Sequence, residues 1–289
     1  MKYQIIRAGN SRSFPEDHPL TAGGQDSGEI ILIVGADAGD AFRKLGETDH
    51  RAAVLIELGT ECLGVHTGES RGEEGSNVLG FARFRLGGGE PSKLVEVVRQ
   101  PRTLESAVAA ARQVFESVGL QVAECNDFAG RIVDRLARPY YNAALRRLDE
   151  GLASAADLDT TLKLGLGYPE GPIELLERTG LSHHCDVTQA LFEAYGEAAY
   201  APARRARVAK QRQELNRQGA KKTTNDNRDA GARKDGGRNG RQLAPVSSYL
   251  RPSALLAVGF LFRHSRRSLR LGGSTMLFLF SFVSFVSKL

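Results

Sequence analysis

The residues whose type and spacing best suit phosphate chemistry are glycines that follow short apolar runs. A dinucleotide-binding turn reads as a strand, then GxGxxG, then a helix, because the glycines let backbone amides approach a pyrophosphate at the helix N-terminus. Here residues 7–10 (RAGN) follow the apolar run 3–6, and residues 35–39 (GADAG) follow the run 30–34. Neither turn completes the pattern, and we expect 87–89 (GGG) to be an ordinary loop. The sequence therefore predicts no intact phosphate-binding turn.

Cysteine and histidine are the other residues that could carry chemistry. The three cysteines are widely spaced and form no CxxC or Cys/His metal spacing, so we expect neither a disulfide framework nor a zinc site. His66 lies in a Gly-rich stretch (GVHTGES), where a surface position is expected. His183 and His184 fall on a predicted helix, and we expect them to cap it or to face solvent.

Short apolar runs bounded by glycine or polar residues indicate buried parallel strands in the first hundred residues. The runs 30–34 (IILIV) and 52–58 (AAVLIEL) flank a short helical pattern at 41–45, which predicts one βαβ unit. A third strand candidate is 93–99 (KLVEVVR), whereas the Gly-rich stretch 59–89 indicates no clear element.

Beyond residue 100 the apolar residues follow a helical spacing, apart from a strand pattern at 120–123. Pro139 interrupts the longest helix and should bend it, and Ser154 is a good N-cap for the next one. The sequence thus predicts an α/β half followed by an all-α half. The expected helices cover about 103–118, 132–148, 154–165, 172–179 and 181–195.

Charge is unevenly divided along the chain. Residues 1–200 hold 20 Lys and Arg against 30 Asp and Glu, whereas residues 201–289 hold 19 against 4, so the net charge of +5 combines −10 with +15. Between 211 and 241 Leu215 is the only large apolar residue, which predicts disorder. The apolar run 276–286 is shorter than the roughly 20 residues of a membrane span. The basic tail could contact nucleic acid or an anionic membrane, but it carries no known binding motif, and we expect a solvated extension instead.

Three segments of the helical half resemble the C-terminal domain of the 3-hydroxyacyl-CoA (3-hydroxybutyryl-CoA) dehydrogenase family. They are LVEVVRQPRT at 94–103, AGRIVDRLARPYYNAALRRLDEGLAS at 129–154 and DLDTTLKLGLGYPEGPIELLERTGL at 157–181. That family carries an LVEV strand, a PGFIxNR helix start and a GxGxPxGPxxLxDxxG turn and helix. The most specific match is GLGYPEGP at 165–172.

This resemblance implies an enzyme with an NAD-binding Rossmann domain and a helical, 6-phosphogluconate-dehydrogenase-like domain. Such an enzyme oxidises a 3-hydroxyacyl-CoA to the 3-ketoacyl-CoA in fatty acid metabolism, with an acyl-CoA substrate and a homodimer formed through the helical domain. The expected organisation is an incomplete Rossmann-like domain at 1–100, the helical domain at 101–210 and a basic tail at 211–289. The GADAG turn and the run 52–58 resemble the second half of the family's Rossmann domain, and most of the first half is missing. The opening residues lack the apolar stretch of a secretory signal, so we expect a cytoplasmic protein.

Two residues carry over to the family's catalytic positions. Glu96 stands in LVEV, where the family's glutamate orients a histidine base; a solvated strand residue is the other reading. Asp134 replaces the asparagine of PGFIxNR, and an ionised carboxylate can only accept hydrogen bonds where the amide could also donate. Asp134 could instead pair with Arg131, Arg135 or Arg138 on its own helix.

The base itself is absent from its expected position. The family's spacing places Phe84 there, and phenylalanine has no titratable atom. No serine stands at the family's serine position near residues 60–62 (TEC). Two functions follow from these residues: a diverged 3-hydroxyacyl-CoA dehydrogenase with an unrecognised base, or an inactive relative that keeps acyl-CoA binding or dimerisation.

Overall fold

The computed structural model describes residues 2–232 of the 289-residue chain, with side chains placed up to residue 219. The described residues up to Asn216 belong to one compact unit. Its centre is a six-stranded sheet whose strands follow one another in chain order. The strands are β1 (Tyr3–Arg7), β2 (Ile30–Val34), β3 (Ala53–Glu57), β4 (Val78–Arg83), β5 (Leu94–Arg99) and β6 (Gln121–Asn126).

The sheet is parallel except at one pair. β1 to β4 are parallel neighbours, β4 and β5 are antiparallel, and β5 and β6 are parallel again. A complete Rossmann sheet reverses its strand order at a switch point, where the dinucleotide binds. No such reversal occurs between Tyr3 and Asn126. The prediction of a partial Rossmann-like half is therefore confirmed.

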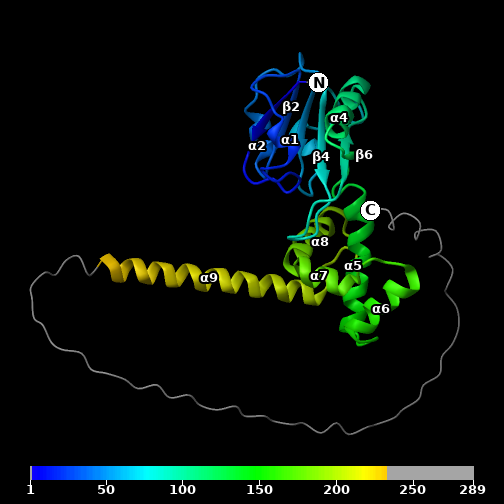
Figure 1. Cartoon of the computed structure of the whole chain (residues 1–289), viewed down its shortest axis with the longest axis vertical. Helices are drawn as coiled ribbons and strands as arrows, with labels where there is room; N and C mark the ends of the chain where they lie inside the picture. The colour runs from blue at the N-terminus through cyan, green and yellow to red at the C-terminus, as the bar shows by residue number, and fades with distance from the viewer. Residues whose placement is uncertain (1, 233–289) are drawn as a thin grey trace, which may run out of the picture. The chain divides into compact units, whose positions relative to one another are not determined.

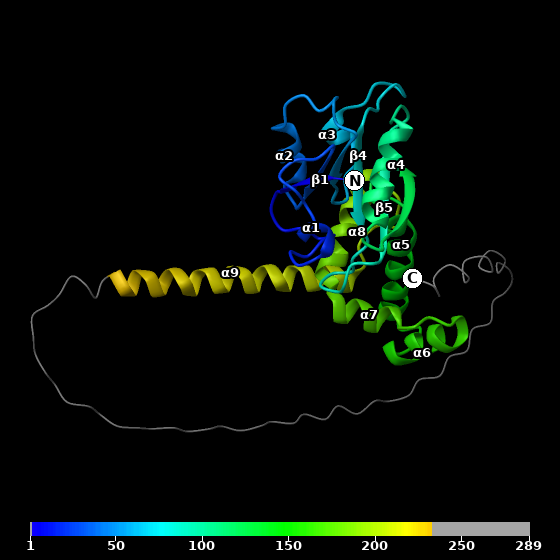
Figure 2. The ribbon, with the colours of Figure 1, turned by 45° about the horizontal axis from the view of Figure 1, so that its top comes forward.

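Helices cover both faces of the sheet (Figures 1 and 2). The helices α1 (Pro19–Ala22) and α4 (Glu105–Glu116) lie on one face, and α2 (Ala38–Arg43) lies on the other together with Leu63, which precedes α3 (Gly64–Thr67). All five residues of β2 are consequently buried. Burial on both faces explains why the strands read as continuous apolar runs instead of alternating ones.

Strand β4 lies in the stretch to which the sequence assigned no element. Packing requires a glycine at position 80 of this strand, because a Cβ there would lie 2.3 Å from Leu58 Cδ1 and 3.2 Å from Val98 Cβ. A glycine inside a strand weakens the apolar pattern although it permits this close approach. The stretch 59–89 therefore contains a strand that periodicity alone does not reveal.

The boundary placed at residue 100 also needs correction. Helix α4 packs on the sheet, and β6 pairs with β5 from Leu94–Gln121 to Arg99–Asn126. Residues 101–126 thus belong to the α/β part, because their apolar side chains complete the core of the sheet instead of a helical bundle.

The remaining helices form the all-α part, as predicted, at one end of the sheet in Figure 1. Pro139 lies inside α5 and cannot donate to the carbonyl of Arg135, so that carbonyl instead accepts a hydrogen bond from the Tyr200 hydroxyl at 3.3 Å. The predicted N-cap is confirmed, since the Ser154 hydroxyl accepts from Asp157 N–H at 3.1 Å. The helices are α5 (Val133–Asp149), α6 (Ala155–Leu166), α7 (Pro172–Thr179), α8 (Leu181–Tyr195) and α9 (Arg204–Ala232).

Helix α9 corrects the expectation of disorder between 211 and 241. The helix begins against the core, where Ala206 is fully buried and the Asp149 carboxylate binds Arg204 and Arg205. Arg, Lys, Gln and Ala favour helix, and a helix that is already nucleated extends at low cost. The disorder prediction is therefore wrong for residues 211–232, and residues 233–241 and the apolar run 276–286 lie outside the described part.

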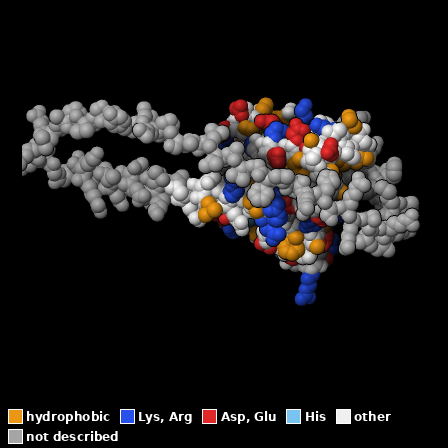
Figure 3. All heavy atoms as spheres, turned by 90° about the horizontal axis from the view of Figure 1, so that it is seen from below, with side chains coloured by type: hydrophobic (Ala, Val, Ile, Leu, Met, Phe, Trp, Pro, Cys, Tyr) orange, Lys and Arg blue, Asp and Glu red, His pale blue; other side chains and the backbone are white. Residues whose placement is uncertain are grey.

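No helix between residues 2 and 232 combines the length and the apolar character that a membrane span requires. On the face drawn in Figure 3, basic, acidic and hydrophobic side chains are intermixed.

The GLGYPEGP segment joins α6 to α7 through a tight contact. Gly167 ends α6 in the left-handed conformation at φ 73°. The Asp159 carboxylate of α6 accepts the N–H groups of Ile173 and Glu174, both at 2.9 Å, and so caps α7 from outside. Gly171 lies against this cap, where a Cβ would be 2.2 Å from Asp159 Cβ.

Two glycines of this segment should respond oppositely to alanine. Gly171→Ala should lower the free energy of unfolding by about 1–3 kcal/mol, because the added methyl group displaces the Asp159 cap. Gly165→Ala is the matched control: its Cβ meets nothing within 4 Å, so it should be neutral or stabilise by up to about 1 kcal/mol. Urea unfolding of both variants measures this, and equal effects would contradict the packing argument.

Candidate functional site

A cavity of about 320 Å³ lies where the sheet meets the helical part. Thr60 and Arg83 line it from the α/β part, and Asp134 and His183 line it from the helices. Its volume falls at the lower end of the range for small-molecule sites. The cavity brings together polar side chains from segments that are far apart in the sequence, which makes it the candidate site.

Glu96 contacts Arg131 of the cavity wall and holds the start of α5. Its side chain is 2% exposed, and its Oε1 accepts the N–H groups of Ile132 and Val133, each at 2.8 Å. The solvated reading of Glu96 is therefore wrong. Within the described residues its partners are these two N–H groups and Arg131, and no histidine is among them.

Arg131 is the cation that faces Glu96. Its Nε lies 3.6 Å from Glu96 Oε2, and its side chain is 5% exposed. Burial raises the pKa of the Glu96 carboxyl, whereas Arg131 and the two N–H groups oppose that rise. Arg131 also adopts φ 53°, in the left-handed region that non-glycine residues rarely enter. The backbone is strained at the point where α5 leaves the sheet.

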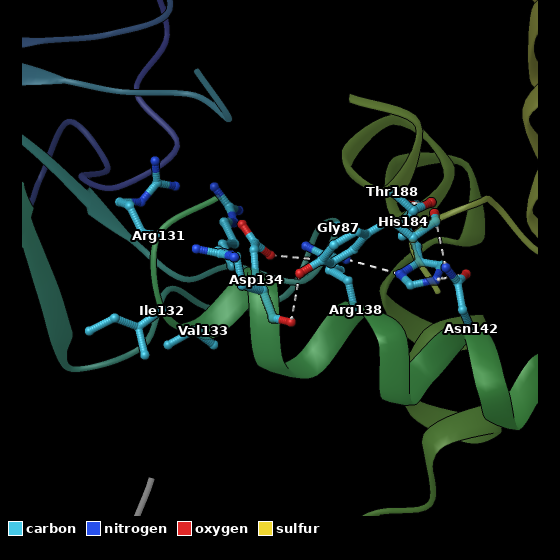
Figure 4. Close-up of polar contacts among 12 residues, drawn as sticks. Gly87, Arg131, Ile132, Val133, Asp134, Arg138, Asn142, His184 and Thr188 are labelled. Carbon is cyan, nitrogen blue, oxygen red and sulfur yellow. Dashed lines mark hydrogen bonds and ion pairs between the residues drawn. The ribbon is translucent and has the colours of Figure 1, made fainter. Parts of the chain in front are cut away.

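Asp134 lines the cavity and pairs with an arginine on its own helix. Its Oδ1 accepts from Arg138 Nε at 2.7 Å, so the predicted pairing is confirmed for Arg138. Figure 4 shows these residues along one side of α5, with His184 and Thr188 of α8 facing them. Arg138 is only 1% exposed, which makes this a buried ion pair.

A line of polar contacts continues from Arg138 into the core. Arg138 Nη1 lies 3.2 Å from His184 Nδ1, and His184 Nε2 lies 3.0 Å from Asn142 Oδ1. Since a guanidinium can only donate, His184 Nδ1 is the acceptor and Nε2 carries the proton given to Asn142. Burial, aided by Arg138, lowers the pKa of His184 to about 3.

The histidines do not occupy the positions expected from the sequence. His184 is buried instead of exposed, and His183 lines the cavity. Burial, with Arg12 and Arg138, lowers the pKa of His183 to about 4, and its buried Nδ1 has no hydrogen-bond partner within residues 2–232. The neutral imidazole can accept a hydrogen bond at the cavity wall, whereas the same burial and cations disfavour its protonated form. In the sequence, His183 stands next to a residue of the buried face of α8. This position alone is too weak a signal to identify His183 as a base.

Two further expected positions are now placed. The ring of Phe84 lies under the Arg138 guanidinium, with 5.5 Å from Arg138 Cζ to the ring centroid, and makes a cation–π contact there. His66 lies in α3 beside Glu61, outside the cavity lining. Thr60 lines the cavity and supplies a hydroxyl near the position where serine was missing.

The turns that a dinucleotide would use are occupied by carboxylates. Gly35 N–H donates to Glu57 Oε2 at 2.7 Å, and Ser13 N–H donates to Glu57 Oε1 at 2.9 Å. At the first turn, a Cβ on Gly9 would lie 2.8 Å from Asp37 Oδ2. A pyrophosphate needs free N–H groups and no adjacent negative charge. The described turns therefore do not fit NAD in the Rossmann manner.

The sheet and helices together have a Rossmann-type fold similar to that of a solved dehydrogenase. The (S)-3-hydroxybutyryl-CoA dehydrogenase of Ralstonia eutropha superposes with a TM-score of 0.52 at 21% identity, over 64% of this chain and 68% of that one. Residues 130–225 match the model of the 3-hydroxyacyl-CoA dehydrogenase C-terminal domain, so this region is similar to that domain.

Curated relatives match over stretches of similar length. The mitochondrial hydroxyacyl-coenzyme A dehydrogenase of Sus scrofa is 40% identical over 105 residues, 36% of this chain and 32% of the relative. The 3-hydroxybutyryl-CoA dehydrogenase of Bradyrhizobium diazoefficiens is 34% identical over 110 residues, 38% of either protein. The chain thus spans about a third of the length of the curated relatives it matches.

Removal of the Glu96 carboxylate should destabilise the fold strongly. Glu96→Ala leaves Arg131 as an unpaired buried charge and two helix N–H groups unsatisfied, so the free energy of unfolding should fall by about 3–5 kcal/mol. Glu96→Gln keeps an acceptor oxygen and should cost less. The control Glu105→Gln changes an exposed carboxylate and should leave the free energy of unfolding nearly unchanged. Denaturant unfolding measures all three, and a Glu96→Ala protein as stable as the control would refute the assigned contact.

Acidification should destabilise the fold through His184. Its pKa of about 3 in the folded chain is below the ordinary 6.5, so the unfolded chain binds the proton first and stability falls as pH drops from about 6.5 to about 3. His184→Gln keeps an acceptor and a donor but does not titrate. The variant should bind about one proton fewer on unfolding in this pH window. The slope of the unfolding free energy against pH should therefore fall by roughly 1.4 kcal/mol per pH unit.

Unfolding midpoints at a series of pH values measure this slope. His50→Gln, which alters an exposed histidine, is the control and should leave the slope unchanged. A His184→Gln slope equal to that of the unaltered chain would show that His184 does not titrate as described.

Proposed function

We propose that this chain is a diverged 3-hydroxyacyl-CoA dehydrogenase that binds the 3-hydroxyacyl end of an acyl-CoA in the cavity between sheet and helices. One observation carries the proposal: Asp134 and His183, which lie in the region that matches the family, line the same cavity as Thr60 of the α/β part. The resemblance further supports a role in fatty acid metabolism.

His183 is the residue we assign to the substrate hydroxyl proton. It is neutral at pH 7, its Nδ1 has no partner among the described residues, and it lines the same cavity as Thr60. The Thr60 hydroxyl can donate to or accept from a substrate oxygen. Glu96 acts on the site through Arg131 and the start of α5, so it positions residues instead of touching the substrate.

NAD is the oxidant that the resemblance implies. Glu57 and Asp37 occupy the described turns, so we assign no step to NAD. Whether NAD binds is tested separately from turnover. Titration of the purified chain with NADH by calorimetry gives that answer directly.

A second candidate function is acyl-CoA binding without turnover. It is favoured by Phe84, which packs under Arg138 at the position of the family's histidine, and by the occupied phosphate turns. Binding of 3-hydroxybutyryl-CoA without NADH formation in the presence of NAD would select this function. The family match supports the dehydrogenase.

His183→Gln should lower kcat/KM for 3-hydroxybutyryl-CoA oxidation about 10²–10⁴-fold, because it removes the proton acceptor. KM should change little if binding is carried by other residues. NADH absorbance measures the rate, and His66→Gln, in α3 outside the cavity lining, is the matched control with an unchanged rate. Equal rates for His183→Gln and the unaltered chain would exclude His183 as the base.

We also propose a homodimer through the helical part and a cytoplasmic location. Leu152 and Leu164 flank or lie on α6 and are 67% and 83% exposed, and a second copy of the helical part would cover such apolar side chains. Light scattering of the purified chain measures the mass, and a monomer at micromolar concentration would refute the dimer.

A further inference from the structure

The cavity carries more positive charge than its surroundings neutralise. Arg12, Arg83 and Arg85 line it, and the hydrogen bonds of their guanidinium groups go to backbone carbonyl oxygens. Within the part of the chain that the structure describes, none of the three has a carboxylate at ion-pair distance. Carbonyl oxygens satisfy the donors without cancelling the charge, so three positive charges remain at this wall.

The acidic side chains of the cavity are already engaged. Asp134 binds Arg138 at 2.7 Å, and Asp186 binds Lys210 Nζ at 2.9 Å. Each of these carboxylates therefore already binds a cation, and Asp134, together with Glu57, only partly offsets the positive charge around Arg12. Burial, together with Arg85 and Arg138, lowers the pKa of the Arg12 guanidinium, which reflects the crowding of positive charge.

Arg131 adds a buried donor that is not satisfied. Its Nε and Nη1 are inaccessible to solvent and have no hydrogen-bond partner within residues 2–232, although its Nε faces Glu96 at 3.6 Å. A buried guanidinium without hydrogen bonds is costly, and here the strained φ of 53° adds to the cost. An acceptor oxygen supplied by a ligand would satisfy these donors.

We propose that this cavity binds an oxyanion, the carboxylate or phosphate group of a small molecule, and that Arg131 donates to it while Arg12, Arg83 and Arg85 supply the field. Planar guanidinium groups match carboxylate and phosphate oxygens in pairs. The inference rests on the proposed function in one respect, namely that the cavity is where a ligand binds. The inference adds that the end of the ligand that enters the cavity is negatively charged. It does not require that the ligand is oxidised.

The test is calorimetric titration of the purified full chain with sodium adipate and with sodium pyrophosphate, at an ionic strength held constant with sodium chloride. We expect saturable binding of at least one of the two anions. Binding of adipate alone identifies a carboxylate site, and binding of pyrophosphate alone identifies a phosphate site. Absence of binding by both would overturn the proposal.

Arg131→Gly removes the guanidinium and accepts the positive φ without strain. It should weaken binding roughly ten- to hundredfold, the effect of one hydrogen bond to a charged group. Arg102→Gln, which alters an exposed arginine paired with Glu73 outside the cavity, is the matched control and should bind as the unaltered chain does. Equal affinity of Arg131→Gly and the control would overturn the role of Arg131.

If Arg131→Gly does not fold, Arg12→Gln at the exposed rim serves in its place. It should weaken binding severalfold, and unchanged affinity would overturn the proposal. Turnover of 3-hydroxybutyryl-CoA is measured on the same preparations. Anion binding without turnover supports the site and rejects the dehydrogenase, whereas turnover without anion binding rejects only the oxyanion site.

Discussion

The contact on which the rest of the site depends is the Glu96 carboxylate against the first N–H groups of α5. A helix leaves these N–H groups without partners and carries partial positive charge there, so a buried carboxylate satisfies both. Because Glu96 belongs to β5, the contact fixes where α5 leaves the sheet and where Arg131 and Asp134 lie. A residue that the family resemblance assigns to catalysis thus also determines how the two parts join.

From that point, helix α5 distributes polar groups at a spacing of four residues. Asp134, Arg138 and Asn142 share one side of the helix, and His184 connects the last two. The Asn142 amide then donates to backbone carbonyls of Ala199 and its neighbours. Such a row is stable only when every member has a partner, because an unpaired charge in the core costs far more than the pair contributes. Full satisfaction of this row therefore selects one arrangement of α5 against α8.

Sequence patterns predicted the elements whose signal is local. Apolar runs identified β2 and β3, and the Ser154 cap identified the start of α6, because burial and capping depend on neighbouring residues. Strand β4 was missed because Gly80 interrupts its apolar pattern. The reason for this glycine, the close contact with Leu58 and Val98, is visible only in the folded sheet. His183 and Arg131 were also missed as cavity residues, because their roles arise from partners that lie tens of residues away. The site was thus predictable where it follows a family motif and unpredictable where tertiary contacts decide it.

The strand order has a consequence for how the chain folds. Every pair of adjacent strands is also consecutive along the chain, so each pairing closes a short segment and costs little loop entropy. A complete Rossmann sheet must instead bring distant strands together at its reversal. Low contact order of this kind favours rapid folding, and the sheet can grow strand by strand as the polypeptide leaves the ribosome. The strand order between Tyr3 and Asn126 thus simplifies assembly and leaves no switch-point crevice in that segment.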